Sequence, residues 1–112
     1  YKIKTFNSIE NIIKSGSIII NCTSYGTKDL EGISPIDQYI LDSKHVVIDI
    51  NYMPKKTKFI IDAENAGATA INGLDMLIYQ ALISIDIWMD KNISSTIDAN
   101  KIKNTLIKEY AK

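Results

Sequence analysis

The sequence predicts an α/β fold built on a parallel sheet. Short runs rich in isoleucine and valine, Ser17–Asn21 and Val46–Ile50, alternate with stretches whose apolar residues recur at helical spacing. Such nearly continuous β-branched runs are typical of parallel strands that are buried on both faces. Alternating strands and helices of this length are the pattern of parallel strands joined by crossover helices.

Residues 1–41 are expected to hold two strands and little regular helix. A strand over Tyr1–Phe6 and a short helix over Ile9–Lys14 precede the strand Ser17–Asn21. Cys22–Asp37 has no clear apolar period, so we expect a loop there. One or two helical turns are expected to follow over Asp37–Leu41.

The second half is expected to complete the sheet and to add helices. Thr57–Ala66 reads as a helix, with the Thr57 hydroxyl in the position of an N-cap and Gly67 as its stop. Ala68–Ile71 is a last short strand. Asn72 and Gly73 then turn the chain into the next helix.

The longest predicted helix, Leu74–Asp90, carries two lines of residues. The apolar stripe consists of Leu74, Leu77, Ile78, Ala81, Leu82, Ile85, Trp88 and Met89. A second line runs through Gly73, Met76 and Gln80, which lie roughly one above another. A bare glycine, a thioether and a neutral amide in a row suit the wall of a pocket. A final helix is expected over Ala99–Ala111.

Composition limits the classes of function. A chain of 112 residues is one domain at most, and its formal net charge is zero, which argues against a nucleic-acid binder with a basic face. The 13 basic residues are all lysines, so no bidentate guanidinium clamp is present. No apolar run approaches the roughly 20 residues of a membrane span. The lone cysteine, Cys22, is expected to be a small buried apolar residue in a reducing, cytoplasmic protein.

Small or polar residues follow each of the three predicted strands Ser17–Asn21, Val46–Ile50 and Ala68–Ile71. The segments after the strands are Asn21–Gly26, Asn51–Pro54 and Asn72–Gly73. Ligands of open parallel sheets bind outside the carboxyl ends of the strands, so the three loops predict a binding crevice. Asp49, inside a buried run, needs a hydrogen-bond partner. His45 has no partner at a recognisable spacing and is expected at the surface.

Three segments together resemble the shikimate dehydrogenase family. They are INCTSYG (Ile20–Gly26), VIDINYMPKKTKFI (Val47–Ile60) and INGLDMLIYQALISIDIW (Ile71–Trp88). The third, similar to the family's NGLGMLxxQA pattern, is the most specific. The resemblance implies part of a Rossmann-like nicotinamide-binding domain, with its second half over residues 1–72. Residues 73–112 would be two C-terminal helices that pack toward the substrate domain.

The resemblance also implies an activity and a set of site residues. The family reduces 3-dehydroshikimate reversibly to shikimate with NADPH, in aromatic amino acid biosynthesis. By motif position, Tyr52 and Gln80 would bind the substrate. The residues implied at the nicotinamide end of NADP are Ile50, Gly73, Met76, Thr23 and Ser24. Gly73 would act through its carbonyl and Met76 by packing on the ring, and no metal site is implied.

Several parts of the family's machinery have no match in this sequence. The catalytic lysine and aspartate belong to the N-terminal substrate-binding domain, so the resemblance implies no catalytic residue here. The chain, which begins at Tyr1 without methionine, is therefore expected to be an inactive piece of an active parent enzyme. An uncovered sheet edge should make it associate with itself, for example as a homodimer, or with the missing domain. Choice between shikimate and quinate, and between NADP and NAD, is made mostly upstream in the family.

Two residues depart from the family pattern, and two other readings compete. Asp75 stands where glycine is usual, and a carboxylate near an anionic substrate would be costly unless it points away. Thr27 replaces a methionine. One alternative is a response-regulator receiver domain with Asp49 as phosphoacceptor, although Met53–Pro54 lies one residue too far along the chain. A non-catalytic α/β interaction module is the other.

Overall fold

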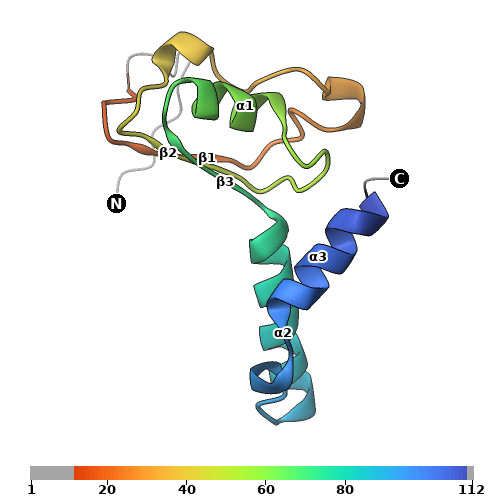
Figure 1. The fold of residues 1–112 in the computed structure, drawn as a ribbon. Helices are drawn as coiled ribbons and strands as arrows, with labels where there is room; N and C mark the ends of the chain where they lie inside the picture. The colour runs from red at the N-terminus through yellow and green to blue at the C-terminus, as the bar shows by residue number, and fades with distance from the viewer. Residues whose placement is uncertain (1–11, 111–112) are drawn as a thin grey trace.

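The computed structural model describes residues 12–110 and contains one parallel sheet, as predicted. The strands β1 (Ile18–Asn21), β2 (Val46–Asp49) and β3 (Thr69–Asn72) lie in that order across the sheet (Figure 1). The predicted strand Tyr1–Phe6 and the first residues of the predicted helix Ile9–Lys14 lie outside the described residues. Residues 12–14 are not helical.

Three α-helices follow the pattern read from the sequence. They are α1 (Lys58–Asn65), α2 (Leu74–Met89) and α3 (Ala99–Tyr110). The three short 3₁₀ helices are η1 (Lys28–Leu30), η2 (Gln38–Ile40) and η3 (Ser94–Thr96). The predicted bounds of these strands and α-helices agree with the structure to within one residue at each end. Within residues 12–110, no helix has the length and apolar character needed to cross a membrane.

Helix α1 covers one face of the sheet (Figure 1). It begins where predicted, because the Thr57 hydroxyl accepts a hydrogen bond from the Ile60 amide at 3.4 Å. It ends before Gly67, whose φ of +75° lies in the left-handed region that glycine adopts without strain. The core between α1 and the sheet consists of Ile19, Ile36, Leu41, Val47, Phe59, Ala63 and Ala68.

The other face of the sheet is largely bare, so the prediction of strands buried on both faces is wrong for β1. Ile18 and Ile20 are 66% and 53% exposed, whereas Ile19 and Asn21 between them are buried. Side chains alternate between faces along a strand, and the core formed with α1 lies on the face to which Ile19 points. The free edge of β1 is also unpaired within residues 12–110.

Helix α2 leads away from the sheet, and α3 runs back against α2, crossing it at an angle (Figure 1). Leu74, Ile78 and Leu82 of α2 are buried and form the α2–α3 cluster, against which these residues pack: Ile97, Ala99, Ile102, Leu106 and Ile107. The predicted apolar stripe is correct at its centre and wrong at its margins. Trp88 is 79% exposed, and Ala81 and Met89 are exposed too. One packed helix covers only a narrow strip of α2, which leaves these margins open.

Acidic side chains shape the connection between α2 and α3. Asp90 ends α2 in the left-handed conformation, with φ of +49°. The Asp98 carboxylate accepts hydrogen bonds from the Asn100 and Lys101 amides at 2.9 and 3.1 Å, and so caps α3. Asp86 accepts hydrogen bonds from the hydroxyl and the backbone amide of Ser94, and these bonds lower the pKa of the Asp86 carboxyl.

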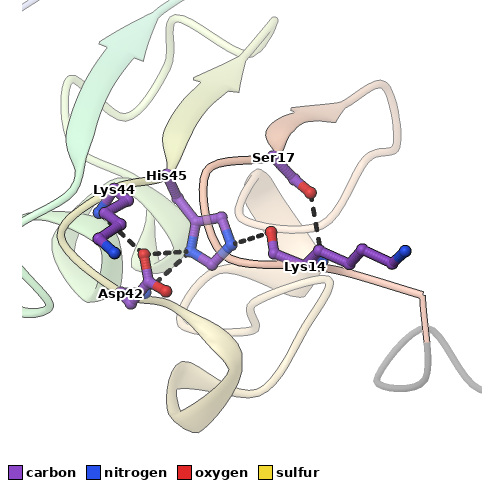
Figure 2. A network of polar contacts seen from close by, with 5 residues as sticks. All are labelled: Lys14, Ser17, Asp42, Lys44 and His45. Atoms are coloured by element: carbon purple, nitrogen blue, oxygen red, sulfur yellow. Dashed lines mark hydrogen bonds and ion pairs between the residues drawn. The ribbon is translucent and has the colours of Figure 1, made fainter.

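His45 is buried, so the prediction of a surface histidine is wrong. Its side chain is 2% exposed, and its Nδ1 accepts a hydrogen bond from the Asp42 amide at 2.9 Å (Figure 2). Its Nε2 lies 3.0 Å from the Lys14 carbonyl, to which it donates as the neutral tautomer. The ring thus ties the segment before β1 to the segment before β2. The Asp42 carboxylate, three residues before His45, also lies 3.3 Å from Nδ1, so the prediction that His45 has no partner at a recognisable spacing is wrong as well.

We predict that His45→Leu destabilises the protein, because both backbone groups lose their partner inside the fold. The free energy of unfolding should fall by about 1–3 kcal/mol, measured by urea denaturation. Lys44→Ala, at the exposed neighbouring position, is the matched control and should change little. Equal effects of the two substitutions would contradict a structural role for the imidazole.

Candidate functional site

The three strands end side by side in polar residues. Asn21, Asp49 and Asn72 occupy the same register across the sheet, one at the carboxyl end of each strand. The loops that follow them therefore begin at one edge, as the sequence predicts. Open parallel sheets bind their ligands at this edge, which makes it the candidate site.

Asp49 is the centre of a buried hydrogen-bond network. Its side chain is 0% exposed. One carboxylate oxygen accepts from the Asn21 side-chain amide at 3.1 Å and from the Asn51 backbone amide at 3.0 Å. The other accepts from the Thr57 hydroxyl at 2.6 Å. The expected structural partner of Asp49 is thus confirmed, and this inaccessible carboxylate argues against the receiver-domain alternative.

The loop after β1 is held by the same network. The Asn21 carbonyl oxygen accepts from the Thr23 amide and hydroxyl at 3.0 and 2.6 Å. The Asn51 side chain donates to the carbonyls of Thr23 and Tyr25 at 3.0 and 3.2 Å. Thr23 and Ser24 are exposed at this edge. The structure therefore places both predicted cofactor residues at the carboxyl edge with a fixed backbone.

Two other residues of this loop correct or refine the sequence analysis. Cys22 is exposed, so the prediction that it is buried is wrong. Cys22 directly follows Asn21, whose side chain is buried. Because successive side chains of an extended chain point to opposite sides, the Cys22 side chain points outward. Thr27, which replaces the family's methionine, donates its hydroxyl to the Ser24 carbonyl at 2.8 Å. Its hydroxyl is thus used within the loop.

The first turn of α2 approaches the loop after β2 very closely. A Cβ atom on Gly73 would lie 2.0 Å from the Ile50 carbonyl oxygen, so only glycine fits. The Asn72 side chain accepts from the Leu74 amide and donates to the Lys55 carbonyl, both at 3.1 Å. Ile50 and Gly73, two predicted cofactor residues, are therefore in direct contact.

Met76 and Gln80 lie on the side of α2 that α3 does not cover. Met76 is 55% exposed and Gln80 is exposed, with its amide donating to the Leu77 carbonyl at 3.2 Å. Tyr52 packs instead with the α2–α3 cluster. The helical positions of that cluster are turned well away from Gln80. The structure thus groups Met76 with Gln80 but does not bring the two predicted substrate residues together.

A cavity of about 580 Å³ lies on the Tyr52 side, between α1, α2 and α3. Its lining includes Tyr52, Asp75 and Lys103, but no residue of the loop 22–27 and not Gln80. Asp75 accepts a hydrogen bond from the Lys103 ammonium group at 2.7 Å. The carboxylate that departs from the family pattern therefore points toward α3 and is neutralised there, a partner the sequence analysis missed.

Comparisons with known proteins agree on one family. No protein-family profile matches the chain. Its sequence is similar to a shikimate dehydrogenase (NADP+) of Dehalococcoides mccartyi, with 42% identity over 81 residues that cover 72% of this chain and 28% of that protein. Its structure is similar to a chorismate mutase/shikimate 5-dehydrogenase fusion protein of Clostridium acetobutylicum, with 35% identity and a TM-score of 0.80, covering 93% and 37%.

A structural neighbour with another substrate is also found. The ligand-free 5-ketofructose reductase of Gluconobacter sp. is 33% identical with a TM-score of 0.61, over 79% of this chain and 32% of that one. The chain spans between 28 and 37% of the length of the curated relatives it matches. Both neighbours share the partial Rossmann-like arrangement of strands and helices described above.

We predict that Gly73→Ala disrupts the first turn of α2, because the added methyl group collides with backbone that cannot turn away. The free energy of unfolding should fall by about 3 kcal/mol or more. Gly32→Ala is the control, since its Cβ meets open space and only its φ of +80° opposes alanine. A loss at Gly73 no larger than that at Gly32, by thermal denaturation, would contradict the close approach.

Proposed function

Because the chain belongs to the shikimate dehydrogenase family, we propose that it is part of an NADP-dependent enzyme that reversibly reduces 3-dehydroshikimate to shikimate. The observation that carries the proposal is the carboxyl edge of the sheet. There Thr23, Ser24, Ile50 and Gly73 lie on loops that the Asp49 network fixes. Residues 1–72 are assigned to the second half of the nicotinamide-binding domain and residues 73–112 to the C-terminal helices.

The residues at this edge fit the nicotinamide end of the cofactor. Gly73 carries no side chain, Ile50 is half-buried beside it, and the exposed Met76 thioether offers a soft apolar surface for a ring. When bound, NADPH supplies the hydride that reduces the carbonyl carbon. The chain's own residues hold and orient the ring, which is a contribution of proximity and not of acid–base chemistry.

Gln80 is the first proposed contact to the substrate. Its amide offers both a donor and an acceptor on the same side of α2 as Met76, so it can bind a hydroxyl or a carboxylate beside the nicotinamide. Tyr52 is the second proposed contact. Since Tyr52 packs on the other side of α2, a substrate that touches both residues must span the first turn of that helix.

The exposed apolar surfaces support a larger protein. Ile83 and Ile87 continue the exposed side of α2 beyond Gln80, and Ile18 and Ile20 leave one face of the sheet bare. We propose that the full-length protein also has the substrate-binding domain, with the catalytic lysine and aspartate, which would match the part of the relatives that this chain does not cover. A homodimer is the competing way to cover these faces. The neutral chain with its free thiol suits a cytoplasmic enzyme that binds neither nucleic acid nor membrane.

A second candidate is a reductase of the same fold with another hydroxy-carbonyl substrate. The similarity to 5-ketofructose reductase favours it, as does Asp75 in a motif where the family has glycine. The reaction class and the cofactor edge remain the same in this alternative, and only the substrate contacts differ.

Turnover by the full-length protein tests the proposal. Absorbance of the reduced nicotinamide ring should appear with shikimate and NADP+, more slowly with quinate or NAD+. Reduction of 5-ketofructose by NADPH, without activity on shikimate, would favour the second candidate. A folded protein that uses neither substrate with either cofactor would refute both.

We predict that Gln80→Ala in the full-length protein impairs the use of shikimate far more than that of NADP+. Loss of one hydrogen bond to the substrate should lower kcat/KM for shikimate by roughly 10-fold or more, with the KM for NADP+ almost unchanged. Gln38→Ala, at an exposed position in η2, is the control. Equal losses for substrate and cofactor would count against the assigned role.

A further inference from the structure

An ion pair joins the first turn of α2 to the middle of α3. The Lys103 ammonium group donates to the Asp75 carboxylate at 2.7 Å, across 28 residues of sequence. The two side chains are 46% (Asp75) and 35% (Lys103) exposed, so water reaches the pair but does not surround it. Asp75 in the first helical turn is also favoured by the helix dipole.

The pair is placed where it can control the candidate site. Asp75 lies two residues after Gly73 and next to Met76, and its side chain points to α3, away from Met76 and Gln80. Asp75 lines the same cavity as Tyr52 but lies away from Met76, so its effect on the nicotinamide ring must pass through the backbone of the first turn.

Two other polar contacts of this turn come from the loop after β2. Asn72 bonds to the Lys55 carbonyl, and the Gly73 amide donates to the Asn51 carbonyl at 3.2 Å, both on the loop after β2. On the opposite side, α3 offers the apolar contacts of the α2–α3 cluster. The hydrophobic effect behind such contacts is not directional. The ion pair adds a directional contact between α3 and the turn.

We propose that Asp75 and Lys103 are positioning residues, which fix the first turn of α2 against α3 and so hold Gly73 and Met76 toward the nicotinamide ring. The inference rests on the proposed function for its ligand, but the positioning itself is a property of the chain. Helix α3 then acts as a brace for the cofactor edge.

A double-mutant cycle in the full-length protein tests the proposal. The variants are Asp75→Asn, Lys103→Gln and the two combined, with Lys101→Gln on exposed α3 surface as the matched control. Each single variant should speed hydrogen exchange of the amides of residues 74–78 and raise the KM for NADP+, each by about 2- to 5-fold. The double variant should be no worse than either single one, because the pair is already broken.

The readouts separate this inference from the proposed function. Faster exchange in both single variants, non-additive in the double, supports positioning even if shikimate is not turned over. Unchanged exchange, or effects that add in the double variant, overturns it even if the protein is a shikimate dehydrogenase. Screening by about 1 M salt should bring wild-type exchange toward that of the variants. A wild-type protein indifferent to salt would also overturn it.

Discussion

The carboxyl edge of the sheet depends on the buried carboxylate of Asp49. Asp49 is removed from water at the end of the central strand, where an ionised group is costly unless hydrogen bonds satisfy it. Its three donors come from Asn21, Asn51 and Thr57, that is, from the neighbouring strand, the following loop and the start of α1. Satisfying this one group therefore fixes three segments at once, and the carboxyl edge of the sheet takes its shape from that requirement.

The same network orders the loops that follow β1 and β2. The Asn21 side chain serves Asp49 with its amide nitrogen and Thr23 with its carbonyl oxygen, so the loop after β1 is ordered through the buried acid. In the loop after β2, the Asn51 backbone amide donates to Asp49, and the Asn51 carbonyl accepts a hydrogen bond from the Gly73 amide. Proposed ligand contacts are thus set by residues that touch no ligand, and Asp75 and Lys103 extend this principle to α3.

Local pattern predicted the elements well, because their causes are local. The cap at Thr57, the β-branched strands and the need of Asp49 for a partner were all visible in short stretches of sequence. The failures have non-local causes. His45 bonds to the Lys14 carbonyl, 31 residues away, and Trp88 is exposed because the segments that pack on α2 within residues 12–110 leave it uncovered. The separation of Tyr52 from Gln80 likewise depends on how α2 is rotated, which sequence spacing does not determine.

We propose that this edge receives the nicotinamide end of the cofactor. Methyl NMR on the full-length protein with labelled methionines tests it most directly, because Met76 lies at the edge and Met89 at the far end of the same helix. Saturating NADP+ should shift the Met76 resonance and leave that of Met89 unchanged. Saturable binding of NADP+ with no change at Met76, or with an equal change at Met89, would contradict the account.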